Sequence, residues 1–130
     1  MSGYKLLDTN ILIYLSKREL LLNDLASPDD RLCISVITYM EALGYLFETQ
    51  DEQEIIEKLC DNLLVLQLED DVVKLVIEIR KLKRIKLPDA IIAASAISNK
   101  ATLITRNTSD FQNVHKDLVI VNPYEAKDSQ

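Results

Sequence analysis

The sequence predicts an α/β fold in which helices flank a parallel sheet in a single domain. Short apolar runs of strand length alternate with longer stretches of helical period, which is typical of a parallel sheet with crossover helices. The chain has 130 residues and 48% of them are hydrophobic, so one domain can bury a core of its own. We expect this domain to span residues 1–130, with a flexible tail from about residue 123.

Composition excludes several classes of site. The formal net charge is −6 and the pI is near 4.7, so an interaction with nucleic acid requires a local basic patch. The single histidine, His115, rules out zinc sites with several histidines and argues against a Ser-His or Cys-His nucleophile. With only Gly3 and Gly44 there is no glycine-rich phosphate loop, and Cys33 and Cys60 lie in apolar segments as small buried residues.

No apolar run approaches the roughly 20 residues of a membrane span, and the N-terminus lacks the pattern of a signal peptide. We therefore expect a cytoplasmic protein without a membrane partner. Carboxylates remain as the abundant functional groups, with 21 Asp and Glu residues.

The first strand and the first helix meet at an aspartate. Lys5–Leu7 is predicted to be a buried strand, Asp8 follows it, and apolar residues recur from Ile11 to Leu15 at helical spacing. In open α/β sheets, ligands bind at the carboxyl ends of the strands, so Asp8 is a candidate for a chemical role. The alternative is that Asp8 only caps the helix.

The next segment supplies a second strand and a second acidic candidate. Ser16–Asp30 is predicted to be a short helix that ends in a turn, and Leu32–Val36 a strand. Ile37–Glu48 has the apolar spacing of a helix with a buried face, and Glu41 lies in its first turns. The alternative for Glu41 is a capping box in which Thr38 caps the helix and Glu41 reaches back to it.

The middle of the chain continues the alternation. Gly44, inside the preceding helix, is expected to permit close packing against another helix or a subunit. Asp51–Asp61 is predicted to be an amphipathic helix, Leu63–Leu68 an apolar strand and Glu69–Arg84 the longest helix. Cations gather at the end of that helix: Arg80, Lys81, Lys83, Arg84 and Lys86. They are either a solvated helix end that compensates the dipole or a patch that faces phosphate.

A third acid begins an alanine-rich helix. Leu87–Ile97 is predicted to be a slim helix packed on all sides, with Pro88 at its first position and Asp89 behind it. Asp89 either complements the helix dipole or stands at the mouth of a site.

The last strands are predicted at Thr102–Thr105 and Leu118–Val121. Between them Asn107 is placed to cap a short helix, with Asp110 in its first turn, an ordinary place for an acid.

Topology brings three of these acids together. In a parallel sheet every helix that follows a strand begins at the same edge, so Asp8, Glu41 and Asp110 share that edge. Asp89 follows a helix, and topology alone does not place it there. Converging carboxylates repel one another unless a cation neutralises them, and oxygen ligands select hard divalent ions such as Mg²⁺. Such a site suits metal-activated water that attacks a phosphodiester.

Four motifs, in their order and spacing, resemble those of the PIN-domain ribonucleases, and among them the VapC-type toxins of bacterial toxin–antitoxin modules. The motifs are Leu7-Asp8-Thr9-Asn10, Met40-Glu41-Ala42, Leu87–Ala94 and Thr105–Phe111. The resemblance covers essentially the whole chain. It implies a PIN-like fold with four to five parallel strands and the first strand at the centre.

The resemblance also implies roles for individual residues. The catalytic and metal-binding acids would be Asp8, Glu41, Asp89 and Asp110. The supporting polar residues would be Thr9, Asn10, Thr105 and Asn107. Asn107 stands where many relatives carry an acid, which leaves open whether the site holds one ion or two. The family implies a Mg²⁺- or Mn²⁺-dependent endoribonuclease that cuts RNA, transfer RNA included, forms a homodimer and is silenced by a cognate antitoxin.

Two other functions fit parts of the sequence. A phosphatase of the haloacid-dehalogenase type also begins with an aspartate at a strand end, but it needs a second aspartate two residues on, where this chain has Asn10. A non-catalytic PIN-type module that binds RNA or serves as a scaffold is the better alternative. Loss of a core acid would indicate it, and none is lost.

Overall fold

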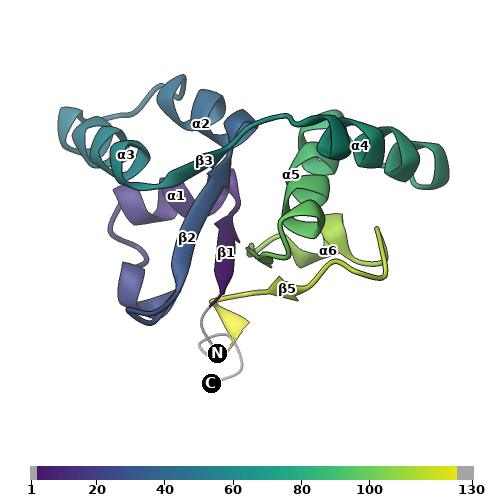
Figure 1. The fold of residues 1–130 in the computed structure, drawn as a ribbon. Coiled ribbons are helices and arrows are strands. Elements are labelled where there is room, and N and C mark those ends of the chain that lie inside the picture. The colour runs from purple at the N-terminus through teal and green to yellow at the C-terminus, as the bar shows by residue number, and fades with distance from the viewer. Residues whose placement is uncertain (1–2, 126–130) are drawn as a thin grey trace.

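The computed structural model describes residues 3–125, which form one sheet with helices on both of its faces (Figure 1). The five strands of this part of the chain are parallel and β1 is central in the order β3-β2-β1-β4-β5. The strands are β1 (Tyr4–Leu7), β2 (Arg31–Ser35), β3 (Leu64–Leu66), β4 (Thr102–Ile104) and β5 (Ile120–Val121). The predicted parallel α/β fold with a central first strand is confirmed.

The connections between these strands are helical. The helices are α1 (Thr9–Ser16), α2 (Val36–Leu43), α3 (Gln50–Asn62), α4 (Asp70–Leu82), α5 (Leu87–Ser98), α6 (Thr108–Phe111) and the short 3₁₀ helix η1 (Leu22–Asp24). No helix within residues 3–125 is both long enough and apolar enough to cross a membrane.

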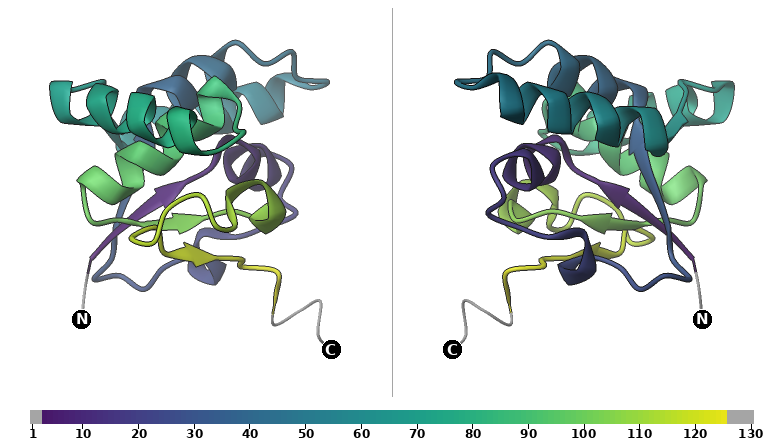
Figure 2. Two further views of the ribbon diagram at one scale, coloured as in Figure 1. Left: turned by 90° about the vertical axis from the view of Figure 1, so that its right-hand side faces the viewer. Right: turned by 90° about the vertical axis from the view of Figure 1, so that its left-hand side faces the viewer.

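Both faces of the sheet are buried. Leu6 and Leu103 pack with α4, α5 and α6, whereas their neighbours Leu7 and Ile104 pack with α1 and α3. Successive side chains of a strand point to opposite faces, so a strand covered on both sides is a continuous apolar run. Figure 2 shows α4 and α5 on one side of the sheet and α1 and α3 on the other. The sheet is thus flanked by a helical layer on each face.

The helix predicted over Ser16–Asp30 is wrong, because α1 ends at Ser16 and residues 17–30 hold only the short 3₁₀ helix η1. The Asp24 carboxylate, at the end of η1, accepts a hydrogen bond from the Leu21 N–H at 3.1 Å, a local contact that competes with helix formation. Leu20 and Leu25 are buried, and a spacing of five residues places them on different faces of a helix. The apolar residues of this segment therefore do not describe one helical face.

The helix predicted over Ile37–Glu48 is shorter in the structure. Gly44 is the C-cap of α2, and its N–H donates to the Met40 carbonyl at 2.9 Å. A Cβ at Gly44 would lie 2.9 Å from that same carbonyl oxygen. Gly44 therefore ends the helix, and within residues 3–125 no other helix packs closely against it, whereas its packing against a subunit stays a prediction.

The chain after β5 packs back on the molecule as far as residue 125. The Tyr124 ring meets the Tyr14 ring edge-on at 5.7 Å between centroids, and the Arg106 guanidinium lies 4.1 Å from the Tyr124 centroid. The rest of the expected tail, residues 126–130, lies outside the described residues.

Candidate functional site

Asp8 lies at the carboxyl end of β1 and is almost fully buried, with 6% of its surface exposed. One carboxylate oxygen, Oδ1, accepts a hydrogen bond from the Thr9 N–H at 2.8 Å, and the other, Oδ2, accepts one from the Thr105 hydroxyl at 2.7 Å. Asp8 is thus the N-cap of α1, as the structural alternative proposed, but only one of its oxygens serves that contact. A buried carboxylate held at both oxygens has a fixed orientation.

Glu41 is tied to the neighbouring helix and not to the start of its own. The Thr9 hydroxyl donates to Glu41 Oε1 at 2.7 Å. That hydroxyl has a single hydrogen, so its 3.0 Å contact with the Thr38 hydroxyl is one in which Thr38 donates. Ser35, whose hydroxyl accepts from the Ile37 N–H at 3.1 Å, is the N-cap of α2. The capping-box interpretation is therefore wrong.

The function of Thr38 was missed at the sequence level. It is fully buried inside α2 and supports the contact between Thr9 and Glu41. Its place three residues before Glu41, on the same face of a helix, was the available signal.

The four acids line one hollow of about 280 Å³ at the carboxyl edge of the sheet. Its polar and charged lining consists of Asp8, Thr9, Asn10, Glu41, Lys86, Asp89, Asn107 and Asp110. Thr105 stands behind it, where its hydroxyl donates to Asp8 and accepts from the Asn107 N–H at 3.0 Å. The structure thus brings together all the predicted acids and their supporting polar residues.

The connection through α5 to β4 explains why Asp89 joins the other acids. Because β4 starts at the opposite edge of the sheet, the helix that leads into it has to begin at the carboxyl edge. Figure 1 shows α4 and α5 on the same side of the sheet, with α4 extending away from β1 and α5 running down along the strand direction. Asp89 is in the first turn of α5 and therefore lies near the ends of β1 and β2.

The electrostatics of the hollow favour a bound cation. Burial is the main cause that raises the pKa of Asp8, with further increases from Glu41 and Asp110, while hydrogen bonds from Thr105 and Thr9 oppose them. Burial also raises the pKa of Asp89, again with help from neighbouring acids. Both groups are more costly to ionise in the protein than in water, and a positive ion among them would relieve that cost.

This burial has a measurable effect on stability. Without a divalent ion, Asp8→Asn is expected to gain stability relative to the wild-type protein as the pH rises from about 4 to 7. The folded-state pKa of Asp8 lies above its ordinary value of 3.8, so the stability it contributes is present below that value and is lost as the pH rises through the raised pKa. Asparagine does not ionise, so the variant does not lose this stability as the pH rises.

Urea unfolding in EDTA at several pH values measures this difference in the free energy of unfolding. Asp29 is exposed, so the Asp29→Asn variant is the control for loss of one charge. A difference that stays constant, or that shrinks as the pH rises, would contradict the expected cost of ionising Asp8.

The chemistry of the donors fits a hard divalent ion. Every acidic, amide and hydroxyl group that lines the hollow offers oxygen, the ligand atom that Mg²⁺ and Mn²⁺ prefer. Among residues 3–125, no three Asp, Glu, His or Cys side chains are already arranged around one point. Mg²⁺ commonly takes one or two carboxylates and keeps several waters, so it does not require such a cage.

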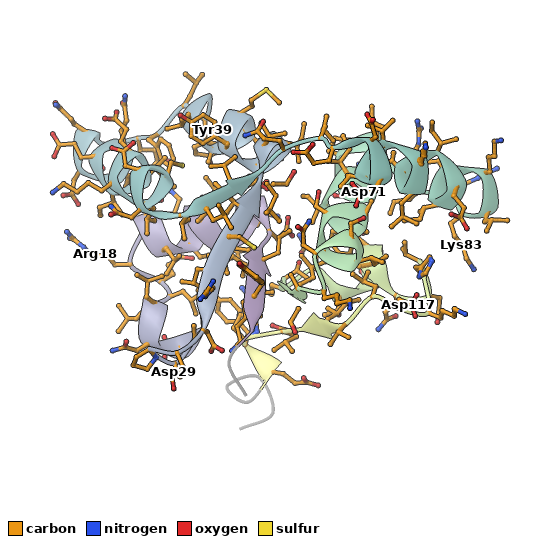
Figure 3. The ribbon with its side chains drawn as sticks, in the orientation of Figure 1. Arg18, Asp29, Tyr39, Asp71, Lys83 and Asp117 are labelled. Atoms are coloured by element: carbon orange, nitrogen blue, oxygen red, sulfur yellow. The ribbon has the colours of Figure 1, made fainter. Side chains whose placement is uncertain are left out.

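The predicted basic patch is divided between two hollows. Arg80, Lys81, Lys83 and Arg84 line a cavity of about 470 Å³ between α4 and the segment that follows it, together with Val76, Ile77, Ile85 and Leu87. Lys86 lines the acidic hollow instead. Figure 3 shows Lys83 at the end of α4 that is remote from β1. The five cations therefore do not line one surface, although the sequence had suggested a single patch.

Comparisons with known proteins agree with this architecture. Residues 5–117 match the family model described as the PIN domain. The chain is 38% identical to Ribonuclease VapC1 of Haemophilus influenzae strain R2866, over 84% of this chain and 90% of that protein. A solved toxin–antitoxin complex from Klebsiella pneumoniae has 31% identity and a TM-score of 0.72, covering 93% of this chain and 98% of that one. VapBC-1 from nontypeable Haemophilus influenzae has 30% identity and a TM-score of 0.74, covering 96% and 100%.

Proposed function

This chain belongs to the PIN-domain family, and from that premise we propose that it is a metal-dependent endoribonuclease and the toxin of a toxin–antitoxin pair. One observation carries the catalytic part of the proposal, the convergence of four carboxylates on one hollow at the carboxyl edge of the sheet. The relatives named as ribonucleases and the solved toxin–antitoxin complexes support the class of substrate and partner.

Asp8, Glu41, Asp89 and Asp110 would hold the ion, Mg²⁺ or Mn²⁺. When bound, such an ion lowers the pKa of water and polarises a phosphoryl oxygen. The protein's own contribution is orientation. Thr105 and the Thr9 N–H hold both oxygens of Asp8, and the Thr9 hydroxyl holds Glu41, so the two carboxylates need little reorganisation when the ion arrives.

Asn10 and Asn107 add neutral oxygen and N–H groups to the hollow. Because Asn107 carries no charge at a position where the family resemblance implies an acid, we propose a single ion with waters that complete its coordination. A second ion would have only the same four carboxylates to neutralise it.

Purified protein incubated with total small RNA and Mg²⁺ tests this function. Internal cleavage into discrete fragments is expected. RNA that stays intact, or that is shortened only from its ends, would contradict an endoribonuclease, and RNA binding without cleavage would favour the non-catalytic module.

The partner chemistry follows from the same hollow. We propose that a cognate antitoxin inhibits by placing a cation, most simply an arginine, among the acids, where it competes with the metal for the same charge.

A homodimer is the second proposed assembly. Exposed apolar side chains on α2 and α4 support it: Tyr39, Met40, Leu43, Val73 and Ile77. Both helices lie along the same upper side of the molecule in Figure 1.

We further propose that the cations of the larger cavity bind the RNA backbone at some distance from the four acids. Neutralising three of them in Lys81→Gln/Lys83→Gln/Arg84→Gln should flatten the slope of log affinity against log salt by roughly two units for single-stranded RNA. Arg80 is left in place because its Nε donates to the Ile85 carbonyl at 3.3 Å and so helps to hold the segment after α4.

A matched triple variant of exposed lysines elsewhere, Lys58→Gln/Lys100→Gln/Lys116→Gln, removes the same net charge and should leave the slope nearly unchanged. Equal slopes for the two triple variants would show that the end of α4 is merely solvated.

A further inference from the structure

One cation stands in the acidic hollow. Lys86 lines it together with Asp8, Glu41, Asp89 and Asp110. The segment that follows α4 separates this hollow from the larger cavity: residues 83, 84, 85 and 87 line the larger cavity, while Lys86 and Pro88 line the acidic one. Lys86 therefore points to the opposite side from its neighbours in the chain.

The position of Lys86 is set by the start of α5. It is the N-cap residue of that helix, with extended backbone angles of φ −67° and ψ 148°, and its side chain makes no capping bond. Its exposed side chain acts electrostatically on Asp89, because its charge lowers the pKa of that carboxyl against the larger raising effect of burial. Within residues 3–125, its ammonium lies within 4.0 Å of no carboxylate oxygen. The ammonium group is thus close to the acids but not engaged in an ion pair with them.

The charge of the hollow gives this lysine a function. Four ionised carboxylates and one divalent ion leave a formal charge of minus two, which would repel an incoming phosphodiester. Lys86 reduces that charge to minus one and offers three N–H donors beside the ion. A lysine ammonium is a compact point charge suited to phosphate.

We propose that Lys86 is a further catalytic residue, which contacts a phosphate oxygen of the RNA at the bond that is cut. This rests on the proposed ribonuclease function. It assigns Lys86 to the reacting phosphate, and the four cations of the larger cavity to the flanking backbone.

The proposal predicts effects of opposite sign on metal and on RNA. In the free protein Lys86 repels a divalent ion, so Lys86→Gln should bind Mn²⁺ as tightly as the wild-type protein or up to about threefold more tightly. Its cleavage of RNA at saturating Mn²⁺ should fall at least about tenfold, the usual effect of losing a charged hydrogen bond. Lys86→Arg should recover most of the activity. Lys74→Gln, an exposed lysine elsewhere on α4, should cleave like the wild-type protein.

The experiment combines Mn²⁺ binding by electron paramagnetic resonance, RNA binding in Ca²⁺ and single-turnover cleavage. Cleavage by Lys86→Gln within about twofold of the wild-type rate at equal Mn²⁺ occupancy would overturn the assignment. Weaker Mn²⁺ binding by Lys86→Gln would also overturn it, because it would show that Lys86 supports the hollow itself.

Failure of the proposed function is a separate outcome. If the wild-type protein cuts no RNA, the ribonuclease is refuted, and RNA binding in Ca²⁺ still decides whether Lys86 holds phosphate. Loss of binding in Lys86→Gln but not in Lys74→Gln supports that contact, and equal binding by the two variants overturns it.

Discussion

Asp8→Asn is expected to slow RNA cleavage at least about a hundredfold, because a catalytic metal contributes several kcal/mol to the stabilisation of the transition state. Asp8 is the most buried of the four acids and the one whose two oxygens are both held by donors. Asparagine keeps the size of the side chain and the acceptor for the Thr9 N–H, but it removes the charge that would hold the ion. The fold should survive, since no apolar contact is lost.

Single-turnover cleavage of a defined RNA measures this loss, with circular dichroism to check the fold. The matched control is Asp29→Asn, which removes one charge from the exposed turn before β2, at the lower end of the molecule in Figure 3. Equal loss of activity in both variants would indicate a general effect of charge, and full activity in Asp8→Asn would refute the proposed metal site.

Removal of divalent ions is expected to have an effect of the same size. EDTA should abolish cleavage, and Mn²⁺ or Mg²⁺ should restore it, because the carboxylates of a hollow without an ion repel a phosphodiester and cannot polarise its oxygens.

The pH dependence of that recovery is part of the same prediction. Protons and metal compete for Asp8 and Asp89, whose pKa values are raised above 3.8 chiefly by burial, so activity should fall as the pH is lowered through those raised values. A higher Mn²⁺ concentration should displace the protons and move this acid limb to lower pH. Cleavage that persists in EDTA, or an acid limb that does not respond to Mn²⁺, would contradict the account.

Much of the fold could be predicted from the sequence because it is encoded by local patterns. Each strand of a doubly covered sheet is a continuous apolar run, and the run that ends at Leu7 leads directly into Asp8. The same argument places Glu41 and Asp110 at the carboxyl edge, because each lies in a helix that follows a strand. The segment after α1 could not be predicted in this way, because its leucines are divided between buried and exposed positions.

The remaining features of the site depend on contacts between elements distant in sequence. Asp89 joins the other acids because α5 leads into β4 and so begins at the carboxyl edge, which follows only once β4 is placed in the parallel sheet. The contact between Thr9 and Glu41 links residues 32 positions apart and replaces the capping box that the local sequence favoured. Lys86 belonged to a run of cations in the sequence, and only the turn into α5 separates it from them.

Binding of Mn²⁺ to the purified protein, followed by electron paramagnetic resonance, tests the central claim most directly, because it needs neither the correct RNA nor an antitoxin. The wild-type protein is expected to bind about one ion per chain, with at least about tenfold weaker binding in Asp8→Asn and unchanged binding in Asp29→Asn. Equal Mn²⁺ binding by all three proteins would contradict a metal site in the acidic hollow.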